Sequence, residues 1–394
     1  MKQRATRLIA LATVAIALAC GARTGLDVPS PEPPVDGAVR HDVVTRDVSV
    51  VDVSPPIDAP PDVSDGSIQT QCTTPPLNLD CTTGPILLTP PQVDAGCDAA
   101  SDITMVSSTL RVDDTFIYFT ALRGTGWPTI MEIWRVAKTG GSMSRVATNI
   151  LGPNCGPSCF ALDGPYVYYW QSDGVHQAAK DGSSDVLYAV PPLATYGNGL
   201  VNIVGSQLYA WENGYQDIGS IYAVSSGTAT FVASFDDPQQ VTVLDGTIYA
   251  ADDNGFESAP LDGGVVSTLI SAYEGINVVN DGTSMYALLG HAVPDYVNIV
   301  QITPGVTNDA IGTIDLGWFA TVDATSVYVW DDTNGGAINL YAFDKTTHAS
   351  TTVVSIPYNM SDDGVLGDLA VDDRCIYYEW ENAVGNQGVY GVAK

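Results

Sequence analysis

The chain has 394 residues, of which 45 are Asp or Glu and 15 are Lys or Arg, giving a formal net charge of -30. A hydrophobic fraction of 45% is enough for a packed core, so the chain as a whole is not expected to be disordered. The acidic excess argues against nucleic acid as a partner and against docking on anionic lipid, because Lys and Arg supply most of the affinity for phosphate groups.

The first 19 residues predict an export signal. Three basic residues precede an apolar run over residues 8–19, which is too short to span a bilayer as a stable helix. The run ends in Ala-Leu-Ala before Cys20 and Gly21, a pattern that resembles the lipobox of bacterial lipoproteins. The resemblance implies that Cys20 is lipidated and anchors the chain to the bacterial outer membrane, facing the periplasm or the cell surface. The alternative is ordinary cleavage near Ala19, which would leave Cys20 as a free thiol.

Residues 20–70 predict a disordered tether that follows the anchor. The segment is rich in Pro and Asp. Pro removes backbone donors and favours an extended chain, and neighbouring Asp side chains repel one another, so no core is expected there. Residues 71–107 contain three cysteines and are interpreted as a lead-in and closure segment, which places the folded domain at residues 108–394.

Six cysteines remain after Cys20, and an even number in an exported chain predicts three disulfides. They are Cys72, Cys81, Cys97, Cys155, Cys159 and Cys375. Many pairings are possible. Cys155 with Cys159, and Cys72 with Cys81, could close small loops, and Cys97 with Cys375 would then join the start of the fold to its end. A metal site is disfavoured because no CxxC pair or histidine partner accompanies these cysteines.

One pattern recurs from residue 108 onward: an alternating apolar strand, an Asp or Gly turn, a second strand with a tyrosine, and further short strands. The repeat tyrosines are Tyr118, Tyr168, Tyr209, Tyr249, Tyr286, Tyr328 and Tyr377. In six copies an aspartate lies four or five residues before the tyrosine. Four short strands in every ~40 residues are typical of a propeller blade, and no segment shows sustained helical periodicity. Seven copies of 41 residues fill the 287 residues from 108 to 394. We therefore predict an all-β fold, a seven-bladed β-propeller of four-stranded antiparallel blades, with six or eight blades as the alternative.

The last copy ends early, because residues 390–394 align with the third strand of the first copy at residues 134–138. An open ring would expose a strand edge, so an N-terminal strand should supply the missing fourth strand. The candidates are residues 86–89 and, second, residues 103–106. A Cys97–Cys375 disulfide would fasten this closure.

Two segments carry a resemblance to a known repeat. They are Tyr168-Tyr169-Trp170 followed by Asp173-Gly174, and residues 133–141. The repeat resembles that of propellers of the YWTD type and of bacterial propeller lipoproteins whose role is unassigned. The resemblance covers about 285 residues. It implies the fold and leaves the function open.

Tryptophans next to acidic residues are the candidate ligand site. Trp170, Trp211 and Trp330 each lie two residues after a repeat tyrosine, and Trp380 lies three after one. Their acidic neighbours include Asp173, Glu212, Asp331 and Glu379. Indole faces beside carboxylates suit sugar rings or cationic groups, and such residues on successive blades would share one rim. The competing interpretation is that the indoles fill the wedges between blades.

No catalytic motif is found. His41, His176, His291 and His348 fall at unlike repeat positions, and there is no GxSxG elbow or phosphate-binding loop. Residues 252–255 and 331–335 offer several oxygens to calcium, although Asp and Asn also simply end strands. No other cofactor is predicted.

These features predict a cell-envelope lipoprotein that uses its propeller to bind protein, peptide or glycan. The alternatives are an envelope enzyme, a lyase or hydrolase with residues in the central channel, and a purely structural scaffold. The membrane is contacted only through the lipid anchor, and nucleic acid is not a partner.

Overall fold

The computed structural model describes most of the chain from residue 103 onward and a short segment before it. The described residues are 81, 85–89, 103–123, 130–150, 158–192, 198–213, 218–236, 238–252, 255–271, 274–292, 295–303, 308–315, 317, 319–333, 337–357, 365–381 and 387–394. All of them belong to one compact unit, Ile68–Lys394. The predicted signal peptide, the anchor at Cys20, the tether, and Cys72, Cys97 and Cys155 lie outside the described residues. Within the described part, no helix has both the length and the apolar character needed to cross a membrane.

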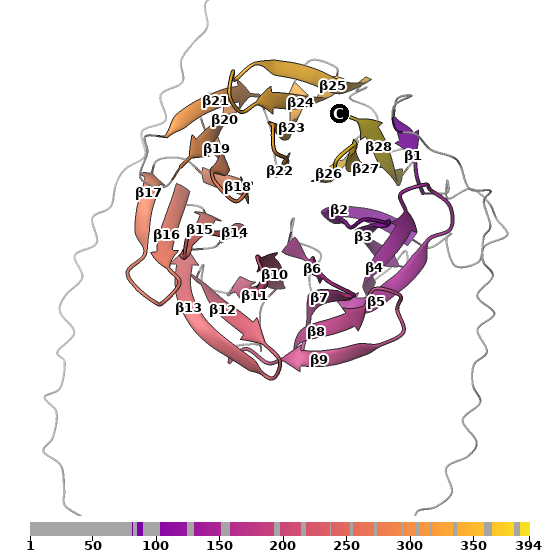
Figure 1. Ribbon diagram of the computed structural model, residues 1–394, viewed down its shortest axis with the longest axis vertical. Coiled ribbons are helices and arrows are strands. Elements are labelled where there is room, and N and C mark those ends of the chain that lie inside the picture. Colours follow the sequence, from indigo (N-terminus) through magenta and orange to yellow (C-terminus); the bar gives the residue numbers. More distant parts are fainter. Residues whose placement is uncertain are drawn as a thin grey trace, which may run out of the picture. The chain divides into compact units, whose positions relative to one another are not determined.

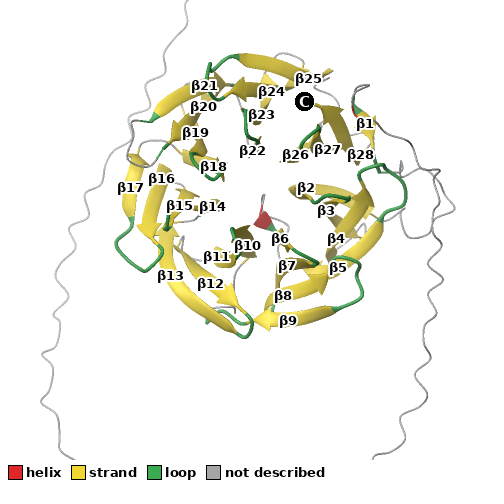
Figure 2. Ribbon diagram, viewed as in Figure 1, coloured by secondary structure: helices red, strands yellow, loops and turns green. Residues whose placement is uncertain are grey.

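Seven four-stranded antiparallel sheets form a ring, so the predicted fold and the predicted number of blades are confirmed (Figure 1). Figure 2 shows that strands and their connecting turns make up nearly all of the ring. Each sheet is a blade, and blades 1 to 7 are numbered along the chain. Blade 1 begins at Ile103, five residues before the predicted start of the domain.

The strands of the first three blades are: in blade 1, β2 (Ile103–Val112), β3 (Phe116–Arg123), β4 (Ile130–Ala137) and β5 (Ser144–Ile150); in blade 2, β6 (Phe160–Asp163), β7 (Tyr166–Gln171), β8 (Gly174–Ala179) and β9 (Asp185–Ala189); in blade 3, β10 (Asn198–Val204), β11 (Gln207–Asn213), β12 (Ile218–Ser225) and β13 (Thr228–Asp236).

The strands of the other blades are: in blade 4, β14 (Gln240–Leu244), β15 (Thr247–Asp252), β16 (Gly255–Pro260) and β17 (Ser267–Ser271); in blade 5, β18 (Glu274–Asn280), β19 (Met285–Ala292), β20 (Asp295–Ile302) and β21 (Asp309–Ile314); in blade 6, β22 (Ala320–Val322), β23 (Ser326–Thr333), β24 (Ala337–Asp344) and β25 (Ser350–Pro357); in blade 7, β26 (Val365–Val371), β27 (Cys375–Glu381), β28 (Gln387–Ala393) and β1 (Ile86–Leu87).

Blade 7 is completed by β1, which confirms the predicted closure by an N-terminal strand. β1 pairs antiparallel with β28, matching Ile86 with Gly391 and Leu87 with Tyr390, and the Leu88 N–H donates to the Val389 carbonyl at 2.8 Å. The first candidate, residues 86–89, is therefore the closing segment. The second, residues 103–106, is wrong because it forms part of the innermost strand of blade 1.

The predicted Cys97–Cys375 and Cys72–Cys81 disulfides are wrong, because Cys375 is bonded to Cys81. The direction of β1 explains the pairing. Because β1 and β27 both run antiparallel to β28, the residues that precede β1 lie beside the start of β27, where Cys375 is located. Cys81 precedes β1 in the sequence, whereas Cys97 follows it. Cys159 also forms a disulfide, and its partner lies outside the described residues.

The six outer strands that follow their own third strand each contain a β-bulge. The register shifts place Val146, Tyr188, Val232, Leu269, Ile311 and Val353 as the extra residues, and β5 has a second shift at Asn149. A bulge twists an edge strand and hinders its pairing with another chain. The bulge also shifts the alternation of side chains halfway along the strand, so the exposed positions cannot be counted from one end alone.

At four interfaces between blades, a lysine of one blade bonds an aspartate of the preceding blade, an arrangement that we call an inter-blade lock. The four pairs are Lys180–Asp113 (2.8 Å, blades 2 and 1), Lys345–Asp281 (2.6 Å, blades 6 and 5), Lys394–Asp323 (2.7 Å, blades 7 and 6) and Lys138–Asp372 (2.6 Å, blades 1 and 7). Each aspartate lies five residues before its repeat tyrosine. Each lysine lies three residues after the third-strand residue that pairs with the repeat tyrosine of the same blade.

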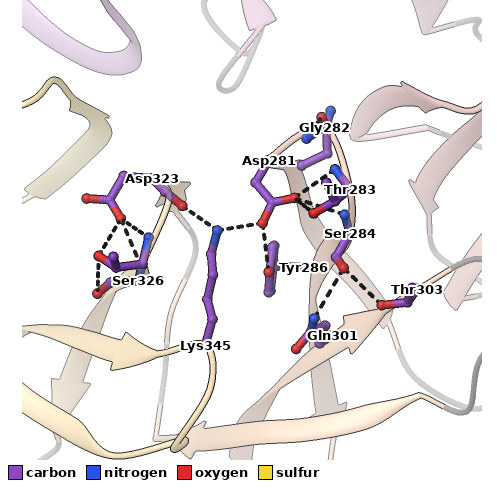
Figure 3. A network of polar contacts seen from close by, with 12 residues as sticks. Asp281, Gly282, Thr283, Ser284, Tyr286, Gln301, Thr303, Asp323, Ser326 and Lys345 are labelled. Atoms are coloured by element: carbon purple, nitrogen blue, oxygen red, sulfur yellow. Dashed lines mark hydrogen bonds and ion pairs between the residues drawn. The ribbon is translucent and has the colours of Figure 1, made fainter.

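The lock between blades 5 and 6 shows how the ammonium group is held (Figure 3). Asp281 accepts hydrogen bonds from the Tyr286 hydroxyl at 2.9 Å and from the backbone N–H groups of Thr283 and Ser284. Lys345 donates to Asp281 and to the Asp323 carbonyl, and its Nζ lies 4.9 Å from the centre of the Tyr286 ring. A carboxylate, a carbonyl and an aromatic face thus surround one ammonium group.

The locks hold their aspartates in the charged form. Burial would raise the pKa of Asp113, but the Lys180 ammonium and the backbone N–H groups of Phe116 and Thr115 outweigh burial and lower this pKa to about 2. The same balance, with Lys138 as the cation, lowers the pKa of Asp372 to about 2. Asp281 and Asp323 have pKa values lowered further in the same way.

The other three interfaces have no such lock. At the interface of blades 3 and 4, Val204 and Leu261 occupy the aspartate and lysine positions, and both pack against the same apolar cluster. At blades 4 and 5 the two positions hold Leu244 and Pro304, the latter outside the described residues. At blades 2 and 3 they hold Asp163 and Ser226, so the aspartate is present and the lysine is not.

Candidate interaction surface

Three of the predicted ligand-binding tryptophans are buried between blades. Trp170, Trp211 and Trp330 are each exposed to 1% or less. Trp170 packs against Gly199 at the start of blade 3, where a Cβ would overlap the indole ring. The Trp211 Nε1 donates to the Pro238 carbonyl at 3.2 Å, and the Trp330 ring meets Tyr378 edge-on at 5.1 Å. Their positions agree with the packing interpretation, which leaves their faces no surface for a ligand.

Trp380 and the acidic neighbours do not form a common site either. Trp380 is half-buried and packs against the same cluster as Trp330. Asp331 is buried and its Oδ1 accepts a hydrogen bond from the Asp315 N–H at 2.9 Å. Asp173 is exposed on blade 2. The side chain of Glu212 lies outside the described residues.

Glu379 is an acid at an apolar repeat position. It lies two residues after its repeat tyrosine, where blade 1 has Thr120 and the other blades have Trp, Ala or Leu, and it is exposed to 1%. Neither carboxyl oxygen has a hydrogen-bond partner among the described residues. Burial, and after it the charge of Asp368, raises the pKa of Glu379 well above its usual value. Asp368 itself bonds the Leu110 N–H and the Arg111 guanidinium across the interface of blades 7 and 1.

The candidate calcium loops and the histidines give no metal centre in the described part of the chain. There, no three His, Cys, Asp or Glu side chains are grouped so that they could hold a metal ion. Both ring nitrogens of His176 face carboxylates, Asp173 at 2.8 Å and Asp185 at 3.1 Å, and the Tyr169 hydroxyl donates to Asp185. His348 lies in an exposed turn, whereas His41 and the side chain of His291 are outside the described residues.

The feature that sequence analysis missed is an exposed apolar surface on the outer strands of blades 2, 3 and 4. Six of the eight large hydrophobic side chains that are exposed in the described residues lie there. They are Val186, Leu187 and Val190 on or beside β9, Phe231 on β13, and Val265 and Leu269 on or before β17. Figure 1 shows these three strands in succession along the outside of the ring. We call the six side chains the outer apolar surface.

The register shows that this surface is specific to these blades. Leu187 pairs with His176 and Phe231 pairs with Tyr222, at one and the same repeat position of blades 2 and 3. The same position holds Arg145, Thr268, Ala310 and Thr352 in blades 1, 4, 5 and 6. Phe231 is 57% exposed and Leu187 47%, so neither side chain is needed to fill the interior. Repeat spacing could have revealed these two residues, but the bulges hide which positions face outward.

The same blades are strongly acidic. Residues 158–271, which form blades 2 to 4, contain 13 Asp and Glu residues against one Lys and no Arg. That lysine, Lys180, is engaged with Asp113 of blade 1. The outer apolar surface therefore lies in a field of negative charge that no cation of these blades offsets.

No protein-family model matches the chain, and no curated protein sequence matches it. Several solved structures are similar to the chain. A puromycin-hydrolyzing peptidase of Mycobacterium tuberculosis is 12% identical with a TM-score of 0.53, covering 74% of this chain and 50% of that one. An acylaminoacyl peptidase of Pyrococcus horikoshii is 12% identical with a TM-score of 0.52, covering 74% and 51%. YCF48 bound to a D1 peptide is 11% identical with a TM-score of 0.51, covering 79% and 97%. The chain spans about half the length of each peptidase, and at these identities the likeness is one of fold.

Proposed function

We propose that the chain is an exported lipoprotein whose propeller binds a protein or peptide partner at the cell envelope. The observation that carries the proposal is the outer apolar surface. A chain with a net charge of -30 has many polar residues to place on its surface, yet it exposes Val, Leu and Phe side chains on three successive edge strands. Exposed apolar groups on strand edges are features of interaction sites.

The charge around the surface indicates the chemistry of the partner. A second copy of this chain would bring the same acidic blades together, and like charges oppose such contact. A partner segment with apolar side chains flanked by Lys or Arg would match both features. We therefore assign the surface to a cationic protein or peptide segment that contacts Leu187 and Phe231.

The fold is compatible with this function. YCF48, a structure of similar fold, was solved with a bound peptide. The prediction of a glycan partner required exposed indole rings, and Trp170, Trp211 and Trp330 are buried. Envelope residence rests on the resemblance at Cys20 to the lipobox.

Site-specific crosslinking in the native host tests the proposal. A photoreactive phenylalanine analogue is placed at Leu187, at Phe231 and, as the matched control, at Thr352, which occupies the same exposed repeat position of blade 6. We expect the first two positions to give one common crosslinked protein that the control does not give. Equal crosslinking from all three positions would contradict the proposal.

Purified components then give the affinity. The double variant L187S/F231S should bind the crosslinked partner roughly 10- to 100-fold more weakly than wild type, because exposed apolar anchors dominate such interfaces. T352A should bind as wild type does. Unchanged affinity of the double variant would remove the outer apolar surface as the site.

The lipid anchor is tested separately. The variant C20S should no longer incorporate labelled palmitate and should leave the membrane fraction, because without acyl chains no anchor remains. Unchanged membrane association of C20S would contradict the lipoprotein part of the proposal and leave the binding part intact.

A further inference from the structure

The interface between blades 2 and 3 has the aspartate of an inter-blade lock without its lysine. Asp163 lies five residues before Tyr168, as the four locked aspartates lie before their tyrosines. The residue at the lysine position of blade 3 is Ser226, in the exposed turn between β12 and β13. The backbone of Asp163 pairs with Tyr166 in the sheet, but no hydrogen bond or ion pair joins its side chain to another residue of the described chain.

The local sequence explains why Asp163 stays exposed. Each locked aspartate accepts the backbone N–H of the residue two positions further on, as Asp113 does from Thr115. In blade 2 that residue is Pro165, which has no N–H to donate. Whereas the tyrosine hydroxyls at the four locks donate to their aspartates, no hydrogen bond joins the Tyr168 hydroxyl to Asp163, and the hydroxyl accepts one from the Gln177 Nε2 at 2.6 Å. The carboxylate is therefore not held by its own turn.

The repeat tyrosine of blade 2 is in contact with two further aromatic rings. The Tyr168 ring meets Tyr166 edge-on at 6.4 Å and Tyr188 edge-on at 5.1 Å. Tyr188 is the bulge residue of β9, where the other outer strands have Val, Leu or Ile. Tyr166 is 38% exposed. Burial raises the pKa of Tyr168, and the hydrogen bond from Gln177 lowers it by less. The charges of Tyr188 and Asp163 raise this pKa further.

Here, as at the lock between blades 1 and 2, the turn after the third strand of one blade lies against the outer strand of the preceding blade. The Gly227 N–H donates to the Tyr188 carbonyl at 2.8 Å, which places the turn of blade 3 against β9. At the lock between blades 1 and 2, Gly182 of the corresponding turn lies against the Arg145 carbonyl on β5. The turn that would carry a lysine is thus in place, and only the lysine is replaced.

We propose that this position is a binding site for a primary ammonium group, the side chain of a lysine on the partner. The site, which we call the ammonium site, consists of Asp163, Tyr166, Tyr168 and Tyr188. Four locks in the same molecule hold an ammonium group with a carboxylate, and at three of them its Nζ lies 4.9 to 5.9 Å from the centre of a tyrosine ring. Tyr188 adjoins Leu187, so the ammonium site borders the outer apolar surface. The inference rests on the proposed function, because it names the group by which the partner is recognised.

The first experiment asks whether the site accepts an ammonium group. The variant S226K supplies the lysine from within the chain. We expect its crystal structure to place the introduced Nζ within about 3 Å of the Asp163 carboxylate. An introduced side chain that points to solvent would overturn the proposal.

The second experiment measures recognition of a lysine in trans. Two pentapeptides are titrated calorimetrically, acetyl-Val-Thr-Lys-Thr-Val-amide and the same peptide with norleucine in place of Lys. Wild type should bind the lysine peptide roughly 5- to 30-fold more tightly, the sum of an exposed ion pair and a cation–π contact. D163N should lose this preference, and S226K should lose it because its own lysine fills the site.

Matched variants separate recognition of lysine at the ammonium site from a general effect of the negative charge of the protein. D181N and S183K make the same changes of charge in an exposed turn of blade 2 and should keep the preference for lysine. Equal affinity of wild type for the two peptides, or no binding of the lysine peptide, would overturn the ammonium site. If L187S/F231S still weakens binding of the crosslinked partner in that case, the proposed function stands without the ammonium site.

Discussion

Two arcs of the ring are held together differently. The interfaces from blade 5 through blades 6, 7 and 1 to blade 2 form a locked arc, in which a lysine reaches back to an aspartate at every interface. The interfaces of blades 2 to 5 form an unlocked arc, where Val204 and Leu261 stand in place of one such pair. The outer apolar surface lies on the unlocked arc. The difference shows that one repeat can keep its backbone while charged pairs join the blades in one part of the ring and apolar side chains are exposed on the outer strands in the other.

Removing the disulfide that closes the ring should cause the largest loss of stability. The variant C81A/C375A removes a bond between residues separated by 294 positions. Such a cross-link reduces the conformational freedom of the unfolded chain. We therefore expect its removal to lower the free energy of unfolding by about 2–5 kcal/mol. Denaturant unfolding of the two proteins without reductant measures the difference. Reductant should destabilise wild type more than the variant, which keeps only the disulfide of Cys159 among the described cysteines. Equal stabilities of the two proteins without reductant would contradict the assigned role.

Breaking one lock should have the next largest effect. In K345M the Asp281 carboxylate loses its cation while its surroundings stay half-buried. Leaving a partly buried charge without its partner should cost about 1–3 kcal/mol. Urea unfolding measures the change in the free energy of unfolding. The control variant is R374M, which removes an exposed cation that is not part of a lock. Equal stabilities of these two variants would show that the locks contribute nothing.

Acid should weaken the locked arc before the unlocked arc. The pKa values of Asp113 and Asp372 are about 2 in the folded chain, below the value of about 4 for a free aspartate. A lowered pKa in the folded state gives stability that is fully present above about pH 5 and is lost as the pH falls toward 2. Hydrogen exchange at pH 6 and pH 3, corrected for intrinsic rates, should show protection lost first in blades 5, 6, 7 and 1. A uniform loss around the ring would contradict the comparison.

The smallest effect concerns a lock built into the unlocked arc. V204D alone should destabilise the chain, because it places a charge where Val204 packs against the apolar cluster. Adding L261K should recover about 0.5 kcal/mol, the usual worth of an ion pair near the surface. A double-mutant cycle measures this coupling. A coupling of zero or of opposite sign would mean that the interface of blades 3 and 4 cannot hold a lock.

The sequence predicted the architecture because the repeat is local. A tyrosine in the second strand and an aspartate in the turn before it recur in register with the blades, and a missing fourth strand shows in the last copy alone. The pairing of Cys375 could not be predicted in the same way, since it depends on the direction in which β1 runs along β28. Cys81 and Cys97 are equally plausible until that direction is known.

The inter-blade locks and the outer apolar surface were less predictable. The locks depend on contacts between blades, and the surface depends on the bulges of the outer strands. Lys180 and Asp113 are 67 residues apart, and only the order of blades in the ring brings them together. The tryptophans stood out in the sequence by size and spacing, but the space beside Gly199 accommodates Trp170 as interior packing. Leu187 and Phe231 were hidden because a bulge in each outer strand changes which side chains face solvent.

The position of Cys81 has a mechanical consequence. A pull on the chain from its N-terminal side arrives at residue 81 before it reaches β1, and the covalent bond to Cys375 carries it onward. The load then enters β27, a strand flanked on both sides within its blade, and bypasses the few hydrogen bonds of the two-residue β1. Tension from that side is therefore borne by the body of blade 7, and the ring stays closed under forces that would peel away so short a strand.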